Sequence, residues 1–401
     1  VFVPFYTRSM VYTMPEFLER RYNPQSRTIL SVISLVSYVL TKVAVTVYAG
    51  GLVFQQVFGI KELWGIDFFW IAAIGLVVLT ALYTIFGGMK SVLYTSVLQT
   101  PILLLGSLII LVLGFKELGG WDEMMRVCGA VTVNDYGDTM TNLIRSNDDA
   151  NFPWLGALIG SAIIGFWYWC TDQFIVQRVL SGKNEMEARR GTIFGAYLKL
   201  LPVFLFLIPG MIAFALHQKY IGAGGEGFLP MLANGTANAD AAFPTLVAKL
   251  LPAGVKGLVV CGILAALMSS LASLFNSSAM LFTIDFYKRF RPETPEKKLV
   301  GIGQVATVVI VILGILWIPI MRSVGDVLYT YLQDVQSVLA PGIAAAFLLG
   351  ICWKRTSAQG GMWGLIAGMV IGLTRLGAKV YYSNAGEVAD STFKYLFYDM
   401  N

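Results

Sequence analysis

The sequence predicts an all-α protein that crosses a membrane many times. Hydrophobic residues make up 56% of the 401 positions and charged residues only 13%, about half of the roughly 25% found in soluble domains. The apolar residues also fall in long runs, and about 20 of them in helical conformation cross a bilayer. These observations exclude a soluble enzyme, a disordered chain and a nucleic-acid-binding protein.

Nine apolar runs are long enough to be spans. They lie at about 28–58, 66–87, 91–115, 153–180, 191–216, 255–286, 299–320, 327–351 and 358–381. Several exceed 25 residues, so these helices are expected to tilt or to extend beyond the bilayer. Residues 1–7 resemble the tail of an earlier span. We therefore expect 1–401 to be one transmembrane domain and a fragment of a longer, N-terminally truncated protein.

The loops between the spans alternate in charge. One set of loops holds 16 of the 29 Lys and Arg residues, and the positive-inside rule assigns that set to the cytoplasm. The loops at 116–152 and 219–252 belong to the other set and are predicted to be extracytoplasmic. Within the second loop, residues 242–249 form an amphipathic stretch, which suits a helix that lies on the membrane surface.

Polar groups interrupt the span at 153–180. The run Trp167-Tyr-Trp-Cys-Thr-Asp-Gln-Phe-Ile-Val-Gln-Arg178 places aromatic rings and a carboxylate, Asp172, after a glycine-rich helix. Broken helices in transporters expose backbone groups to substrates in this way, and paired rings stack on flat apolar faces of ligands. The alternative is an interfacial aromatic belt. Asp172 counts against that alternative, because a belt needs no carboxylate.

A stripe of small polar residues marks the span at 255–286. Ala266, Ser269 and Ser270 fall at i, i+3 and i+4, so they share one face of a helix. Hydroxyl and carbonyl oxygens are the ligands that a hard cation prefers, and a weakly held sodium ion needs no carboxylate cage. Close helix packing through small residues is the alternative, and it is common in membranes.

The start of the span at 327–351 is also polar. Tyr329 and Gln333 are four residues apart and share a face. An aromatic ring beside an amide suits a ligand rich in hydroxyl groups. The alternative is a solvated helix start.

Two lysines lie inside predicted spans. Lys199 follows Arg189 by ten residues, about 15 Å of helix, which predicts a position near the middle of the bilayer. We expect it to donate to a substrate or to pair with a carboxylate, and Lys42 invites the same interpretation. Pro202 and Pro209 predict a kink in the helix that carries Lys199.

No arrangement of residues points to catalysis. The single histidine, His217, is predicted at the end of a span, which disfavours a histidine-based metal site or a catalytic triad. No phosphate-binding loop is present, which disfavours ATP drive within this chain. The four cysteines show no disulfide framework. The sequence therefore predicts a protein that is not an enzyme.

Several runs together resemble the sodium/solute symporter family, and within it the sodium/glucose (or galactose) cotransporters. Besides the run at 167–178, they are Thr13-Met-Pro-Glu-Phe-Leu, Leu82-Tyr-Thr-Ile-Phe-Gly-Gly, Met268-Ser-Ser-Leu, Phe275-Asn-Ser and Phe347-Leu-Leu-Gly-Ile-Cys-Trp-Lys-Arg. The likeness follows the same order along nearly the whole chain. It implies the inverted-repeat transporter fold of five plus five helices, with the first helix of each repeat broken.

The resemblance also implies roles for single residues. It gives Tyr168 the place of the inner-gate tyrosine beneath the sugar, with Trp169 beside it, and Tyr329 that of an outer-gate aromatic. It matches Lys199 and Gln333 to hydrogen-bond donors of the sugar, and more loosely Lys42 to a position near it. It matches Ala266, Ser269 and Ser270 to sodium ligands, namely one backbone carbonyl and two hydroxyls.

The chain departs from the family pattern in several places. It lacks the first core helix and most of the second, which supply further sodium and sugar contacts in the family. Gly165 replaces a polar residue near the sugar, and Ser96 stands where many relatives carry an aspartate on the sodium exit path. The segment 219–243 lacks the cysteine cluster of animal relatives, which indicates a bacterial source.

The expected function is sodium-coupled symport of a glucose- or galactose-like sugar across the plasma membrane by alternating access. The coupling ion is Na⁺, and the partners are the sugar, sodium and the lipid bilayer. Coupling requires that ion and sugar favour the same conformations. Three alternatives stay open: symport of another solute (inositol, an organic acid or an amino acid), a sensor domain that binds a solute without moving it, and a channel. The lysine within the span and the aromatic gates disfavour the channel.

Overall fold

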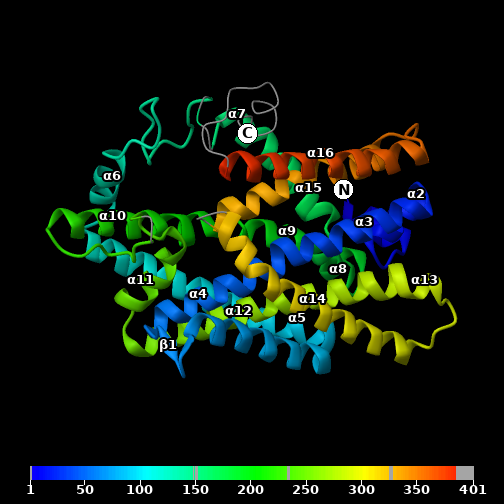
Figure 1. Cartoon of the computed structure of the whole chain (residues 1–401), viewed down its shortest axis with the longest axis horizontal. Helices are drawn as coiled ribbons and strands as arrows, with labels where there is room; N and C mark the ends of the chain where they lie inside the picture. The colour runs from blue at the N-terminus through cyan, green and yellow to red at the C-terminus, as the bar shows by residue number, and fades with distance from the viewer. Residues whose placement is uncertain (1, 148, 150–151, 233–234, 325–327, 385–401) are drawn as a thin grey trace. The chain divides into compact units, whose positions relative to one another are not determined.

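The structure, a computed structural model, describes residues 2–147, 149, 152–232, 235–324 and 328–384. Within these ranges, the side chains of residues 83, 85–92, 95, 320–324, 329–330 and 379–384 are not described. Nearly all the described elements are helices (Figure 1).

The elements follow one another along the chain. In order they are α1 (Phe2–Ser9), α2 (Met14–Arg21), α3 (Pro24–Ser37), η1 (Tyr38–Val43), α4 (Ala44–Phe58), β1 (Glu62–Leu63), β2 (Ile66–Asp67), α5 (Phe68–Leu118), α6 (Trp121–Gly129), α7 (Trp154–Phe166), η2 (Trp167–Thr171), α8 (Gln173–Leu180), α9 (Glu185–Leu198), η3 (Val203–Leu207), α10 (Ile208–Gly222), η4 (Ala239–Ala241), α11 (Ala242–Leu250), α12 (Ala253–Met280), η5 (Leu281–Tyr287), α13 (Lys288–Phe290), α14 (Glu296–Val324), α15 (Leu328–Cys352) and α16 (Ala358–Asn384). The strands β1 and β2 form an antiparallel pair of two residues each, a small addition to the predicted all-α class.

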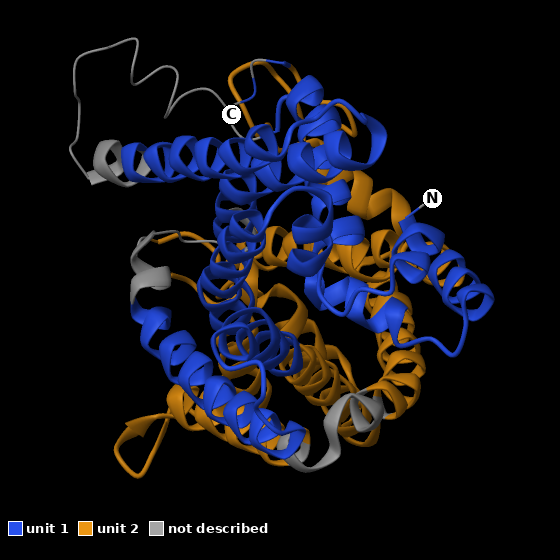
Figure 2. Ribbon diagram, turned by 90° about the vertical axis from the view of Figure 1, so that its right-hand side faces the viewer, with its two compact units in different colours: residues 1–45, 147–193, 274–401 blue, residues 46–146, 194–273 orange. Residues whose placement is uncertain are grey.

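The helices divide into two compact units, coloured separately in Figure 2. Unit 1 comprises residues 1–45, 147–193 and 274–401, and unit 2 comprises 46–146 and 194–273. Three of the four boundaries fall near the start of α4 and within α9 and α12, so these helices contribute to both units, and the fourth lies between residues 146 and 147.

Eight of the described helical segments are long and apolar enough to cross a membrane. They correspond to eight of the nine predicted spans. The predicted span at 66–87 differs, because α5 continues from Phe68 to Leu118 without a turn, and its first part is a shorter apolar helix, Phe68–Leu82. The glycines at 87 and 88 weaken a helix by only about 1 kcal/mol each. They do not break it as a proline would.

In unit 1, α15 and α16 pack closely through glycines. A Cβ atom built on Gly368 would lie 2.6 Å from the Cα of Gly342, so position 368 has no room for a side chain. Small residues of this kind let helix backbones approach one another in membranes. The end of α15 is held by Arg21, whose guanidinium donates to the carbonyls of Gly350 at 2.6 Å and Trp353 at 3.1 Å. A cation there satisfies carbonyls that have no partner within the helix.

In the part of the chain that the structure describes, four π-helical turns interrupt the long helices: η1, η2, η3 and η5. Such turns are rare and frequently lie at functional sites. The turn η2 is followed by a true break, since the backbone of Asp172 is extended (φ −76°, ψ 123°). Its carboxylate accepts the backbone N–H of Phe174 and caps α8, as aspartate does at helix starts. The predicted interruption of this span is therefore present.

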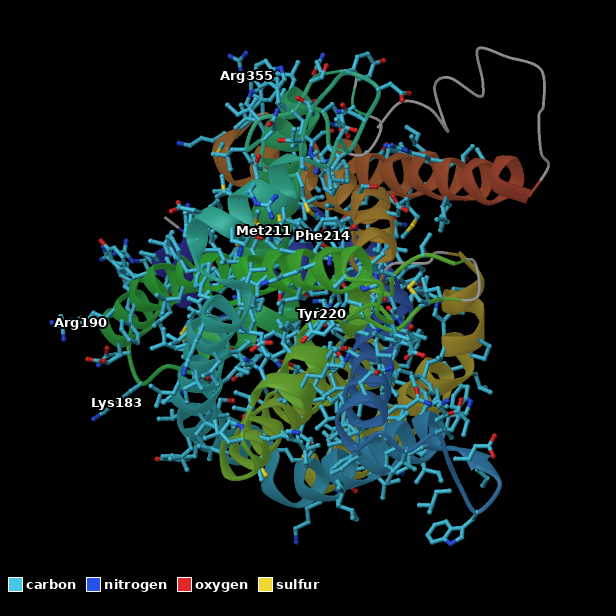
Figure 3. All side chains as sticks on the ribbon, turned by 90° about the vertical axis from the view of Figure 1, so that its left-hand side faces the viewer. Lys183, Arg190, Met211, Phe214, Tyr220 and Arg355 are labelled. Atoms are coloured by element: carbon cyan, nitrogen blue, oxygen red, sulfur yellow. The ribbon has the colours of Figure 1, made fainter. Side chains whose placement is uncertain are left out.

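In unit 2, the core forms around α10, which packs against α5, α6 and α11. Ile212 and Leu216 of α10 are fully buried beside Ile110 and Met124. Figure 3 labels Met211, Phe214 and Tyr220 along the same helix. The predicted amphipathic stretch at 242–249 is helical, because α11 covers Ala242–Leu250.

Candidate functional site

The predicted lysine Lys42 forms an ion pair inside unit 1. It lies in the π-helical turn η1 and is only 8% exposed. Its Nζ donates to Oδ2 of Asp172, and the hydroxyl of Tyr38 donates to Oδ1 of the same carboxylate at 2.6 Å. The N–H of Phe174 also donates to Oδ1, at 3.1 Å. Both carboxylate oxygens are thus satisfied, which a buried ion pair requires.

Aromatic rings surround the ammonium of Lys42. Its Nζ lies 4.6 Å from the ring centre of Phe174, 4.7 Å from Tyr38, 5.3 Å from Tyr168 and 5.9 Å from Trp167. Each of these distances is within the range of a cation–π interaction. The ammonium therefore ties η1 to both sides of the break at Asp172.

The two predicted sugar-stacking residues extend from η2. Tyr168 is half-buried and Trp169 is 48% exposed. Their rings meet edge to face, with centroids 5.2 Å apart and planes at 90°. The structure thus brings Lys42, Tyr168 and Asp172 together and leaves about half of the Trp169 surface exposed.

The helix α15, which carries Gln333, packs against α7, η1 and η2. Its first turns are anchored by Tyr331, whose hydroxyl donates to the carbonyl of Leu40 in η1 at 2.9 Å and accepts the indole N–H of Trp317 at 2.8 Å. Gln333 itself is half-buried. The side chain of Tyr329 lies outside the described part of the structure.

The three predicted sodium ligands lie on α12. Ser269 is buried, and Ala266 and Ser270 are half-buried. The hydroxyl of Ser269 lies 2.5 Å from that of Ser96 on α5, within unit 2. Ser96 is one of the departures from the family pattern, and its hydroxyl contacts one of the three predicted ligands. The oxygen donors suit a hard cation carried as cargo.

Lys199 occupies a helix break in unit 2. Helix α9 ends at Leu198, and Lys199 and Leu200 form a turn before η3. Pro202 explains the break, because its ring clashes with the carbonyl four residues earlier. The regular α-helix is interrupted near Lys199, and the Lys199 side chain is exposed in the structure.

A second buried ion pair in unit 1 is absent from the sequence-based predictions. Oδ1 of Asp285 accepts hydrogen bonds from Nε of Arg27 at 2.8 Å and from the hydroxyl of Thr13 at 2.9 Å. Ser31 donates to Oδ2 at 3.1 Å. The signal in the sequence is Asp285 itself, a carboxylate in the apolar run Leu281–Tyr287, where an acid needs a partner.

Within the described residues, no group of three or more His, Cys, Asp and Glu side chains could hold a metal ion. A site for sodium built from hydroxyls and carbonyls is not such a group.

The sequence model of the sodium:solute symporter family matches residues 1–368. The chain belongs to this family. The resemblance found in the sequence runs is therefore confirmed over most of the chain.

Three relatives illustrate the similarity. The chain is 39% identical to the sodium/mannose cotransporter SLC5A10 of Bos taurus, 37% to the sodium/myo-inositol cotransporter 2 of Homo sapiens and 37% to the sodium/glucose cotransporter 4 of Mus musculus. These alignments cover 94%, 94% and 96% of this chain. They cover 64%, 56% and 57% of the relatives, so the chain spans about three fifths of their length.

A solved structure illustrates the shared fold. A Na⁺-coupled sialic acid symporter, in a substrate-bound outward-open state, matches with a TM-score of 0.70 and 22% identity. The match covers 96% of this chain and 74% of the other. The predicted class, a multi-pass membrane protein with the inverted-repeat transporter fold and broken helices, is confirmed.

Proposed function

We propose that this chain carries out sodium-coupled symport of a sugar or of a polyol such as myo-inositol. Membership of the family over residues 1–368 carries the proposal. The three relatives are named as cotransporters of mannose, myo-inositol and glucose, all neutral rings rich in hydroxyl groups. The membrane we propose is the plasma membrane, where a sodium gradient drives uptake.

The proposed solute contacts come from several elements. Tyr168 and Trp169 offer ring faces to the apolar side of a sugar, and Gln333 and Lys199 offer hydrogen bonds to its hydroxyls. Tyr329 is proposed as the outer-gate aromatic. Ala266, Ser269 and Ser270 are proposed to bind the sodium ion.

Lys42 takes a different role in this proposal. Because its ammonium is paired with Asp172 and enclosed by rings, we assign it to positioning Tyr168 beside the break in the helix. Each ligand shifts the conformational equilibrium only through its differential affinity for the two states. The ion pair and the ring contacts hold the helix break beside Tyr168. A solute that binds on Tyr168 can therefore shift the conformational equilibrium of this break.

The test is uptake into proteoliposomes. Radiolabelled glucose, galactose, mannose and myo-inositol are offered to the reconstituted protein, with and without an inward sodium gradient. The proposal predicts saturable uptake of at least one of them that requires sodium. Binding without flux would favour a sensor, non-saturable flux would favour a channel, and inactivity towards all four solutes would contradict the assignment to sugars and polyols.

A further inference from the structure

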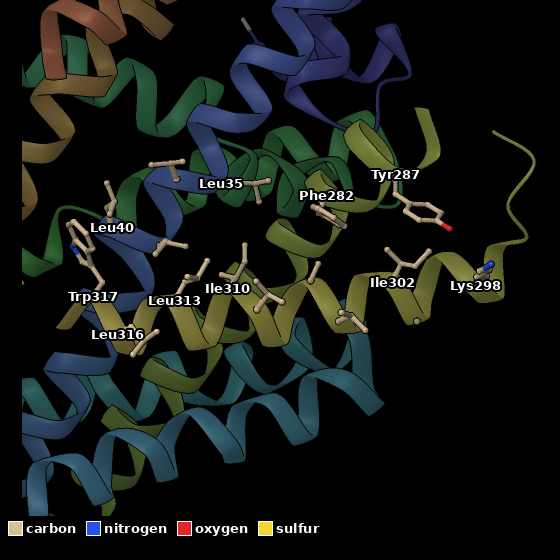
Figure 4. A pocket seen from close by; sticks show the side chains of 16 residues that line it. Leu35, Leu40, Phe282, Tyr287, Lys298, Ile302, Ile310, Leu313, Leu316 and Trp317 are labelled. Carbon is tan, nitrogen blue, oxygen red and sulfur yellow. The ribbon is translucent and has the colours of Figure 1, made fainter. Parts of the chain in front are cut away.

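A long apolar groove runs beside α14 in unit 1 (Figure 4). It has a volume of about 900 Å³ and is bounded by α14 together with residues of α3, η1 and η5. Aliphatic and aromatic side chains make up most of its wall, and some are strongly exposed, including Val305 and Leu316 at 64% each. Because α14 is long and apolar enough to cross a membrane, this exposed surface is suited to contact with the acyl chains of lipids.

Two polar side chains, Tyr287 and Lys298, line one end of the groove, and Trp317 lies at the other (Figure 4). The indole N–H of Trp317 already donates to Tyr331. Among the residues that the structure describes, the ammonium of Lys298 has no hydrogen-bond or ion-pair partner, and the side chain is exposed. A ligand in the groove therefore meets a cation at one end only.

The length of the groove matches the thickness of a bilayer, and the basic residues at one end match the cytoplasmic side of a membrane. Lys298 and Trp317 are 19 positions apart, about 28 Å of helix, and the hydrocarbon core of a bilayer is about 30 Å thick. Lys298 is the last residue of the segment 288–298, which contains five basic residues (Lys or Arg) and two Glu residues. Such basic segments mark the cytoplasmic side and attract anionic lipid headgroups.

The charge at one end of the groove favours a lipid over a further apolar helix, because a phosphate pairs with the exposed ammonium of Lys298 and an apolar side chain does not. We propose that the groove binds one anionic phospholipid of the cytoplasmic leaflet. Its acyl chain lies along Val305 and Ile310, and its phosphate contacts Lys298 and the hydroxyl of Tyr287.

The first experiment measures lipid binding by native mass spectrometry of the protein in detergent. Phosphatidylglycerol and phosphatidylcholine with identical acyl chains are the two probes. Wild-type protein is expected to retain phosphatidylglycerol at least threefold better than phosphatidylcholine. Lys298→Ala removes this preference, whereas Lys297→Ala, a change of the neighbouring exposed lysine that does not line the groove, keeps it. Equal retention of the two lipids by wild type, or equal effects of the two lysine variants, would overturn the proposal.

The second experiment tests the position of the acyl chain. A Cβ atom at Gly301, which lines the groove, and one at Gly257 of α12 would each meet open space. Gly301→Trp is expected to lower retention of phosphatidylglycerol at least threefold, and Gly257→Trp to leave it unchanged. A photoactivatable phosphatidylglycerol with a diazirine in its acyl chain provides a readout on the unaltered protein. Crosslinks at 301–310 support the proposal, and crosslinks confined to other helices refute it.

Discussion

The guanidinium of Arg27 lies 2.7 Å from the carboxylate of Asp285, although 258 positions separate the two residues. The Asp285 side chain is fully buried and the Arg27 side chain is 13% exposed. Arg27 has a second carboxylate partner, Glu19, at 2.5 Å, whereas the other partners of Asp285 that the structure describes are the hydroxyls of Thr13 and Ser31. The two partners therefore differ. Without Arg27, Asp285 would keep only neutral hydroxyl groups among its described partners, whereas without Asp285, Arg27 would keep the carboxylate of Glu19.

This asymmetry predicts unequal effects of removing either partner. Arg27→Met leaves a buried carboxylate without a cation and is expected to destabilise the protein by about 3–5 kcal/mol. Asp285→Asn leaves Arg27 paired with Glu19 and is expected to cost about 1.5–3 kcal/mol. The measurement is unfolding in mixed micelles, followed by circular dichroism.

Two further variants control this comparison. Arg20→Met breaks an exposed pair with Glu16 and should cost no more than about 1 kcal/mol. The double variant Arg27→Met/Asp285→Leu should recover most of the loss, because it leaves no unpaired buried charge. Equal destabilisation by Arg27→Met and Asp285→Asn would show that the asymmetry has no energetic weight.

The sequence predicts most spans because length and local composition determine them. The prediction at 358–381 nearly coincides with α16, Ala358–Asn384. The loop predicted between 87 and 91 fails for a local reason, since two glycines and a lysine are compatible with a continuous helix. The identity of the buried pair is harder to predict. Composition indicates that Asp285 needs a cation, but no periodicity relates it to Arg27.

The candidate site also has features that the sequence predicts and features that only the fold determines. A break near Asp172 is predictable, because a carboxylate inside an apolar run is costly unless it caps a helix or meets a cation. The alternatives for Lys42, a substrate donor or a partner of a carboxylate, cannot be separated without the fold. The structure selects the carboxylate. The roles of Gln333 and Lys199 towards a solute stay predictions.

The pair of Lys42 and Asp172 is expected to matter for transport as a unit. Lys42→Met and Asp172→Asn should each lower sodium-driven uptake at least tenfold, because each leaves one buried charge beside Tyr168 without its partner. The double variant should regain part of the loss, which is the mark of coupled residues. Lys183→Met, a change of an exposed lysine that points away from the ribbon (Figure 3), is the control. If the fold-loss of uptake in the double variant equals the product of the two single fold-losses, the two residues are not coupled.

Gln333→Ala is expected to raise the KM for the solute about tenfold and to leave the sodium dependence intact. The expected loss corresponds to a hydrogen bond worth about 1–1.5 kcal/mol. Uptake is measured against solute concentration at saturating sodium, and then against sodium concentration at saturating solute. Gln359→Ala, at an exposed glutamine of α16, should behave as wild type. An unchanged KM would remove Gln333 from the solute site.

The reactivity of the Cys128 thiol provides a measure of how closely α6 packs against α10. Burial raises the pKa of its thiol above the ordinary value of 9.0, and the thiol donates to the carbonyl of Met211 at 3.7 Å. Because the folded-state pKa is raised, the neutral thiol favours the folded state below pH 9, and that contribution is lost as the pH rises through the folded-state pKa. We expect alkylation of Cys128 by iodoacetamide at pH 8 to be at least 100-fold slower in the folded protein than in unfolded protein.

Ile212→Ala provides the contrast for Cys128. It opens a cavity in the same core, destabilises the core by about 2–5 kcal/mol and should accelerate the alkylation. A rate in the wild type equal to that of the unfolded protein would show that α6 does not pack as the structure has it.

The contact between Ser96 and Ser269 leads to a prediction about the apparent affinity for sodium. An aspartate at 96 would place a negative charge within a few ångströms of the proposed ligands Ser269 and Ser270, and an opposite charge at such a distance attracts a cation strongly. Ser96→Asp is therefore expected to lower the sodium concentration for half-maximal uptake at least threefold, and Ser270→Ala to raise it by a similar factor. Ser278→Ala, on the same helix outside the triplet, should leave it unchanged. If Ser96→Asp and Ser270→Ala both respond to sodium as the wild type does, the ion binds elsewhere and the stripe on α12 serves helix packing alone.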